Sequence, residues 1–174
     1  QTAKENPDPF ANDDRNQFIR QEQNEGRAEL VMLDEDGPGA IVRFWLTTDS
    51  QKAGAIRIYL DGSTLPAVVF PAFDLMKNDL GIGAPFVLPH PGYTPDGPGG
   101  STLWLPIPYA RHCKVTWEEK SNGARYYQIN TRAYPAGTAV QTFEKGRLEK
   151  LGDRLALTAW SLQSSPPPAG CKVT

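Results

Sequence analysis

Short segments in which apolar and polar residues alternate recur along this chain, and turn-forming residues separate them. The clearest segment runs from Ala40 to Thr48, where Val42, Phe44 and Leu46 occupy alternate positions. The segment from Ala55 to Asp61 repeats the pattern. Successive side chains of a strand point to opposite faces of a sheet, so a period of two is typical of a strand with one buried face. The chain is therefore predicted to be all-β.

Turn-forming residues are frequent enough to connect many short strands. The 174 residues include 16 Gly and 16 Pro, and proline is well above its average usage of about 5%. Asp61-Gly62 and Asn122-Gly123 are typical of tight hairpin turns. The candidate strands cover residues 27–33, 40–48, 55–61, 65–70, 103–109, 111–118, 124–134 and 138–143. This series predicts an antiparallel jelly-roll or β-sandwich domain.

The alternation also predicts which side chains fill the space between two sheets. In each candidate strand, one set of alternate positions carries the larger apolar residues, and this set is expected to face inward. The residues expected in or near the core are Val42, Phe44, Leu46, Ile56, Ile58, Val115, Trp117 and Ile129.

Near the end of the chain the spacing of apolar residues changes from two to three or four. The residues with this spacing are Leu148, Leu151, Leu155, Ala159 and Leu162. The spacing predicts an amphipathic helix that packs this stripe on one flank of the domain, with Trp160 at its margin. Gly152 weakens a helix by about 1 kcal/mol relative to Ala, and Asp153 could cap a second segment. The helix is therefore expected to divide in two.

The sequence divides into three parts by composition. Residues 1–26 are polar and rich in Asn, Asp and Gln, which predicts an irregular arm. Residues 27–162 are expected to form the jelly-roll domain with its C-terminal helix, and residues 163–174 a Pro-rich linker to a second domain. The first residues, Gln1-Thr2-Ala3-Lys4, are similar to a mature terminus left by cleavage, which predicts a secreted or periplasmic protein.

Charge and motif content exclude several classes of function. The formal net charge is −2, and no concentrated basic face or long apolar run is evident, so we expect no nucleic-acid or membrane partner. We also expect no cofactor and no metal site. Gly81-Ile82-Gly83 lacks the rest of a phosphate-binding loop, and the neighbours His112 and Cys113 would face opposite sides of a strand. Cys113 is expected to be a buried thiol, the alternative being a bridge to Cys171.

Polar and aromatic side chains share faces on two of the candidate strands. Arg43 and Trp45 lie on one face of their strand. On the late strand the shared face carries Tyr126, Gln128, Asn130, Arg132 and Tyr134. Sugar sites combine a flat apolar surface with hydrogen-bonding groups, so these faces are candidates for carbohydrate binding. The alternative is a sheet surface packed against a neighbouring sheet or subunit.

Acidic residues form few arrangements suited to hydrolysis. Glycosidases place two carboxyl groups about 5–10 Å apart. Glu118 and Glu119 are adjacent on a strand and diverge, and we expect them to be solvated, like the turn residues 34–36. Asn12, Asp13 and Asp14 lie in the arm, where they are either solvated or form a clamp that binds vicinal hydroxyls. No catalytic pair is therefore assigned within this chain.

Several segments, taken in order, resemble the sequence of one enzyme family. They are Gly37-Pro38-Gly39-Ala40-Ile41-Val42-Arg43-Phe44-Trp45, Ile56-Arg57-Ile58-Tyr59-Leu60-Asp61-Gly62, Pro71-Ala72-Phe73-Asp74-Leu75, Leu105-Pro106-Ile107-Pro108-Tyr109 and Tyr126-Tyr127-Gln128-Ile129-Asn130. Asn12-Asp13-Asp14 is similar to part of the family's Gly-Gly-Asn-Asp-Asp segment. The family is glycoside hydrolase family 172, and the resemblance extends over roughly residues 8–162.

This resemblance implies two consecutive jelly rolls per subunit and cyclic oligomers, often trimers. It implies a secreted bacterial enzyme that acts on fructofuranosides or arabinofuranosides with retention, using two glutamates. Those glutamates belong to Trp-Trp-Gly-Glu-Gly-Glu-like and Gly-Thr-Gly-Thr-Glu-Asp-Tyr-like segments, neither of which occurs here. They are expected downstream of this chain, which alone is expected to be inactive. The residues expected to bind substrate are Asn12, Asp13, Asp14, Arg43 and Trp45.

A second interpretation comes from a different class of protein. The chain could be a non-catalytic jelly-roll module that binds carbohydrate or assembles subunits. Two suitably spaced glutamates in the sequence that follows would favour the enzyme.

Overall fold

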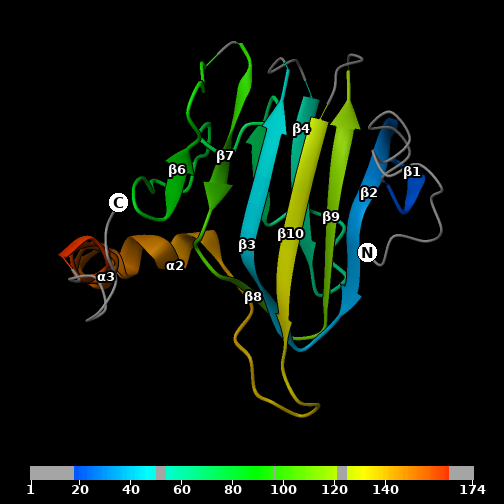
Figure 1. The fold of residues 1–174 in the computed structure, drawn as a ribbon. Helices are drawn as coiled ribbons and strands as arrows, with labels where there is room; N and C mark the ends of the chain where they lie inside the picture. Colours follow the sequence, from blue (N-terminus) through cyan, green and yellow to red (C-terminus); the bar gives the residue numbers. More distant parts are fainter. Residues whose placement is uncertain (1–17, 50–53, 96, 121–124, 165–174) are drawn as a thin grey trace, which may run out of the picture.

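The computed structural model describes residues 18–49, 54–95, 97–120 and 125–164. Two antiparallel sheets of five strands each pack face to face (Figure 1). Sheet A contains, in spatial order, β1 (Arg20–Asn24), β2 (Arg27–Asp36), β9 (His112–Glu119), β4 (Gly54–Leu60) and β5 (Val68–Pro71). Sheet B contains β10 (Arg125–Ala133), β3 (Gly39–Thr48), β7 (Gly99–Leu103) and β6 (Val87–Pro89), and β8 (Ile107–Tyr109) also pairs with β3. The prediction of an antiparallel β-sandwich is confirmed.

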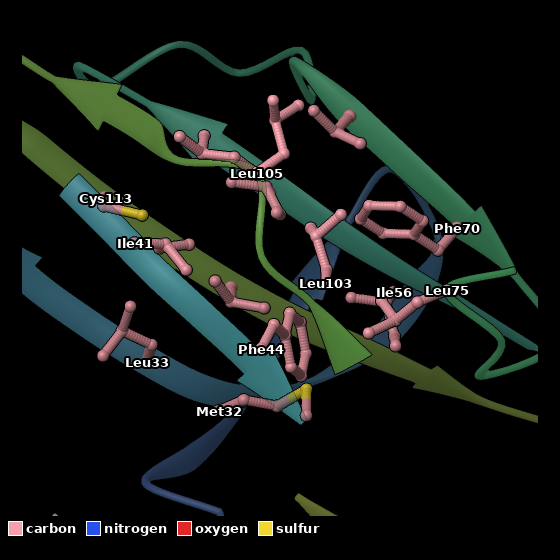
Figure 2. Packing of buried hydrophobic residues seen from close by; sticks show 14 of the residues in the cluster. Met32, Leu33, Ile41, Phe44, Ile56, Phe70, Leu75, Leu103, Leu105 and Cys113 are labelled. Carbon is pink, nitrogen blue, oxygen red and sulfur yellow. The ribbon is translucent and has the colours of Figure 1, made fainter. Parts of the chain in front are cut away.

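The core lies between the two sheets and contains most of the residues predicted for it. Those that are at most 2% exposed are Phe44, Leu46, Ile56, Ile58, Val115 and Trp117. Figure 2 shows how Phe44 from sheet B and Ile56 from sheet A lie in the same apolar layer. Burying a side chain of this size contributes about 1.5–3 kcal/mol, so this layer is the main stabilising feature of the domain.

A β-bulge in β3 explains why Val42 is half-buried and Ile41 is in the core instead. Arg43 pairs with Asn130, but the next pair along the strand joins Ile41 to Thr131, so Val42 is an extra residue. A bulge places two residues opposite one and interrupts the alternation of faces. Ile41 is therefore buried together with Phe44, although the alternation predicted opposite faces for them. Ile129, also predicted as core, is half-buried and packs against the core.

The chain passes between the two sheets where the sequence predicted a hairpin. β9 pairs with β2 and β4 in sheet A, whereas β10 pairs with β3 in sheet B. The prediction that Asn122-Gly123 joins two paired strands is therefore wrong, and the dipeptide itself lies outside the described residues. By contrast, Asp61-Gly62 does form a turn between β4 and β5, with positive φ at both residues.

The predicted irregular arm includes a strand at its C-terminal end. β1 consists of Arg-Gln-Glu-Gln-Asn and pairs with β2 through a two-residue turn at Glu25 and Gly26, both with positive φ. An edge strand can be polar on both faces, so hydrophobic alternation does not reveal it. The C-terminal part of the range 1–26, which was predicted to be irregular, therefore contains a strand.

Proline and glycine move or shorten three of the other predicted strands. The predicted strand at 65–70 begins only at Val68, after Pro66. The one predicted at 103–109 is divided by Leu105-Pro106 into the end of β7 and β8. Residues 138–143 form no strand, although the Phe143 N–H donates to the Pro108 carbonyl at 2.8 Å.

The predicted division of the C-terminal helix is confirmed, but its packing is looser than predicted. α2 (Lys145–Lys150) and α3 (Gly152–Ser164) lie at the side of the sandwich (Figure 1). Leu148 and Leu155 pack against the core. Leu157, Trp160 and Leu162 are 60–68% exposed, so much of the apolar surface of α3 faces solvent. No helix in the described parts of the chain is long and apolar enough to cross a membrane.

Candidate carbohydrate-binding face

The outer face of sheet B gathers polar and aromatic side chains from four segments. Gln128 of β10 and Thr102 of β7 are both paired with Trp45 of β3, and Asn130 is paired with Arg43. Side chains at directly paired positions point to the same face. We use the name sheet B plate for the group formed by Arg43, Trp45, His90, Thr102, Trp104, Gln128 and Asn130.

Arg43 is held in the plate by two amides and one aromatic ring. Its Nη1 donates to Gln128 Oε1 at 3.2 Å and to Asn130 Oδ1 at 3.1 Å. Its guanidinium carbon lies 5.4 Å from the centre of the Trp104 ring, within the range of a cation–π interaction. These contacts hold a charged side chain in one position on an open surface.

Trp45 is flanked by an imidazole. The Trp45 and His90 rings stack with their centroids 5.6 Å apart and an interplanar angle of 21°. His90 Nε2 lies 2.8 Å from Thr102 Oγ1. Burial, and then the positive charge of Arg43, lower the pKa of His90 below its ordinary value. The ring is therefore neutral at pH 7 and stacks on Trp45 as an uncharged group.

Large apolar side chains on and beside this plate are open to solvent. Trp104 is 45% exposed, and Leu88 and Tyr126 are each 39% exposed. Paired strand positions place Leu88 and Tyr126 on the same outer face. A sheet surface with exposed aromatic rings beside hydrogen-bonding groups suits a ligand that has both apolar and hydroxyl-bearing faces.

The structure brings together some of the predicted substrate-binding residues. Arg43 and Trp45 share the outer face of β3, as their spacing predicted. Asn12, Asp13 and Asp14 lie outside the described residues, so their position relative to this face stays a prediction. Sequence reasoning assigned neither Trp104 nor His90 to the site. The pairing of β7 beside β3, which brings both residues to the plate, left no recognisable pattern in the sequence.

Glu118 is not solvated, contrary to expectation. It is 8% exposed on the outer face of sheet A, where its carboxylate lies 2.7 Å from the Arg57 guanidinium. Burial opposes ionisation of Glu118, but hydrogen bonds from Arg57 and Lys120 outweigh it and lower its pKa. Asp34 is half-buried and pairs with His112 at 2.6 Å. Glu118 is therefore paired with Arg57 and Lys120, and Asp34 is paired with the His112 ring. Both carboxylates support the fold.

Cys113 is a free, buried thiol. The expectation of a buried thiol is therefore confirmed. Burial raises its pKa to about 12, so it is not a thiolate at neutral pH. His112 points to the opposite face of β9, and Cys171 lies outside the described residues. Within the described residues, no group of three or more His, Cys, Asp or Glu side chains could hold a metal ion.

The architecture and the plate together define a two-layer antiparallel β-sandwich with one aromatic and cationic outer face. A family model described as GH172 first beta-sandwich domain matches residues 1–151. The chain therefore belongs to glycoside hydrolase family 172 and carries its first β-sandwich domain. A search of curated proteins found no match.

Proposed function

We propose that this chain is the N-terminal jelly-roll part of a secreted bacterial glycoside hydrolase that acts on fructofuranosides or arabinofuranosides. In this proposal the sheet B plate contacts the carbohydrate, with Arg43 and Trp45 as the principal groups. The observation that carries the proposal is the arrangement of donors and rings on one face: Arg43 is fixed by two amides beside the exposed Trp104. Asn12, Asp13 and Asp14 are proposed to complete the same site.

The chemistry of a furanoside fits these groups. Its C–H faces pack against indole rings, and its hydroxyls accept hydrogen bonds from guanidinium and amide N–H groups. Trp45 and Trp104 supply the rings. Arg43, Gln128 and Asn130 supply donors that point outward from the sheet.

Hydrolysis requires groups that we propose lie outside this chain. Retaining glycosidases use two carboxyl groups about 5–5.5 Å apart. The most buried carboxylates of the described residues are occupied by structural contacts: Glu29 by Tyr59, Thr116 and Arg27, and Asp74 by Tyr93. The catalytic glutamates are therefore proposed to be supplied by downstream sequence.

The test uses the purified 174-residue chain beside the protein of the complete reading frame. Nitrophenyl arabinofuranoside and fructofuranoside should be hydrolysed by the complete protein and not by the chain alone. Calorimetric titration with an arabinofuranosyl oligosaccharide should detect weak binding by the chain, and Trp45→Ala should weaken it about tenfold. Turnover by the chain close to that of the complete protein would contradict the division of roles, and unaltered binding in Trp45→Ala would remove the plate from the site.

The exposed apolar side chains on and beside the plate also favour the second interpretation, in which the chain is a module that assembles subunits. Leu88, Trp104 and Tyr126 could pack against a second subunit, and we propose that the complete protein is a homo-oligomer. Sedimentation of wild type and Tyr126→Ala separates the two functions. Loss of association without loss of sugar binding would assign this part of the face to assembly.

A further inference from the structure

Acidic residues are distributed very unevenly between the strands of the two sheets, whereas both sheets contain basic residues. The strands of sheet A contain the carboxyl residues Glu22, Glu29, Asp34, Glu35, Asp36, Glu118 and Glu119. The strands of sheet B contain no Asp or Glu, although they contain Arg43, Arg125 and Arg132. Arg125 is buried, near the Trp117 ring. The outer face of sheet B is therefore a cationic surface on a chain whose formal net charge is −2.

Arg43 forms no ion pair with a carboxylate in the described part of the chain, unlike several other arginines of the domain. Arg20, Arg27, Arg57 and Arg147 each form an ion pair with an Asp or Glu side chain. Among the described residues, no carboxylate lies within ion-pair distance of Arg43. Its contacts are two neutral amide oxygens and one indole ring. These contacts fix the guanidinium without neutralising its charge.

The N–H donors of Arg43 that the amides do not use lie on one edge of its guanidinium group. Both hydrogen bonds to the amides use Nη1, and Nε and Nη2 have no hydrogen-bond partner in the described part of the chain. The Nε–Nη2 edge of a guanidinium presents two parallel N–H groups, which is the geometry that binds a carboxylate or phosphate through two oxygens. Trp104 lies 5.4 Å from the guanidinium carbon, and Trp45 is on the same outer face of β3 two residues further along.

We infer that the sheet B plate recognises an oxyanion carried on a glycan, either the carboxylate of a uronate or a phosphate, through the Nε–Nη2 edge of Arg43. The inference rests on the proposed function, since it takes this face as the one that contacts carbohydrate. It adds a substrate class to that function: an anionic glycan rather than a wholly neutral furanoside.

The first test compares two forms of one polysaccharide. The 174-residue chain is titrated with an arabinogalactan that bears glucuronate and with the same material after carboxyl reduction, which removes the charge and keeps the linkages. Binding should be about tenfold weaker after reduction, as expected for loss of a charged hydrogen-bonded pair, and the difference should shrink in 1 M salt. A separate titration with arabinose 5-phosphate tests phosphate. Equal affinity for the two polysaccharides, with no binding of the phosphate, would overturn the inference and leave furanoside binding intact.

Substitutions of Arg43 and Arg132 distinguish a specific contact of Arg43 with the anion from a general effect of positive charge on this face. Arg43→Gln should abolish the preference for the charged polysaccharide, and Arg43→Lys should retain part of it, because it keeps the charge but loses the two-pronged contact. Arg132→Gln removes the same charge from the neighbouring strand β10 of the same sheet and should keep most of the preference. An equal loss in Arg132→Gln would overturn the assignment to Arg43. Thermal unfolding of each variant verifies the fold.

An acidic protein surface is the competing occupant. If the charge of Arg43 serves contact with a second copy, sedimentation should show salt-dependent association that Arg43→Gln removes, while neither polysaccharide binds. That result would overturn both the inference and the proposed function. Failure of the charge preference alone, with neutral binding that still depends on Trp45, would overturn only the inference.

Discussion

The outer faces of the two sheets both carry polar side chains, but they differ in whether those side chains satisfy one another. On sheet A, Glu29 is 1% exposed and accepts hydrogen bonds from Tyr59 and Thr116 at 2.8–3.0 Å. On sheet B, Arg43 has no carboxylate partner among the described residues and is held at the surface by two amides. A polar group that is fully partnered inside the protein stabilises the fold, whereas a fixed group with free donors is available to a ligand.

The largest expected effect is on sheet A. Glu29→Ala leaves the Tyr59 and Thr116 hydroxyls without their acceptor and removes a carboxylate from the buried region near Arg57. We expect the free energy of unfolding to fall by about 3–5 kcal/mol, measured by urea denaturation. The matched control is Glu25→Ala, which removes an exposed partner of Arg27 and should change stability by less than about 1 kcal/mol. Similar losses in the two variants would remove the basis of the comparison.

The second effect is the pH dependence of sheet A. Because the pKa of Glu118 is lower in the folded protein than its ordinary value of 4.5, its ion pairs stabilise the fold above that value. This contribution is lost as the pH falls through the folded-state pKa. We expect Glu118→Gln to lower stability by about 1–3 kcal/mol at pH 7 and by progressively less toward pH 3. A difference that stays constant between these pH values would show that ionisation of Glu118 does not matter.

The third effect is on sheet B and concerns binding. Trp104→Ala removes an exposed ring and the cation–π contact of Arg43. Affinity for an arabinofuranosyl oligosaccharide should fall about tenfold, which corresponds to about 1.4 kcal/mol. Leu157→Ala, which removes exposed apolar surface from α3, is the control and should leave affinity unchanged. Calorimetry that finds both variants equal to wild type would place the ligand elsewhere.

The smallest effect is the one that most sharply separates the two faces. Arg43→Gln should change the free energy of unfolding by less than about 0.5 kcal/mol, because the site is open to solvent and the side chain has no counter-ion in the described residues. Chemical denaturation provides the measurement. A loss above about 2 kcal/mol would mean that Arg43 supports the fold in the way that Glu29 does.

Strands in which apolar and polar residues alternate strongly could be predicted from the sequence. Strands that form mainly through pairing with a neighbouring strand could not. β3 and β4 bury one face against the opposite sheet, so hydrophobic period alone located them. β1 is polar on both faces and is held by backbone pairing with β2 and by ion pairs of Arg20 and Glu22. Such interactions depend on residues distant in sequence, which leave no local periodicity.

The candidate site shows the same limit. Arg43 and Trp45 are two residues apart on one strand, so their common face follows from strand geometry. His90 and Trp104 reach them from other segments, and only the order of strands in sheet B makes them neighbours. The helix stripe was predicted to pack on the domain, but only part of it does: Leu148 and Leu155 pack against the core, whereas Leu151 and Leu162 are exposed.

The bulge at Val42 has a consequence for how this surface varies between related sequences. Ile41 faces the core and Arg43 faces solvent, and Val42 is the additional residue between them. A strand lacking that residue would alternate regularly and would still place the counterparts of Ile41 inside and of Arg43 and Trp45 outside. One insertion or deletion at this point is therefore compatible with the same exposed surface. Homologues are best aligned on the Arg-x-Trp pair itself, since its distance in residues from the preceding glycines is free to differ by one.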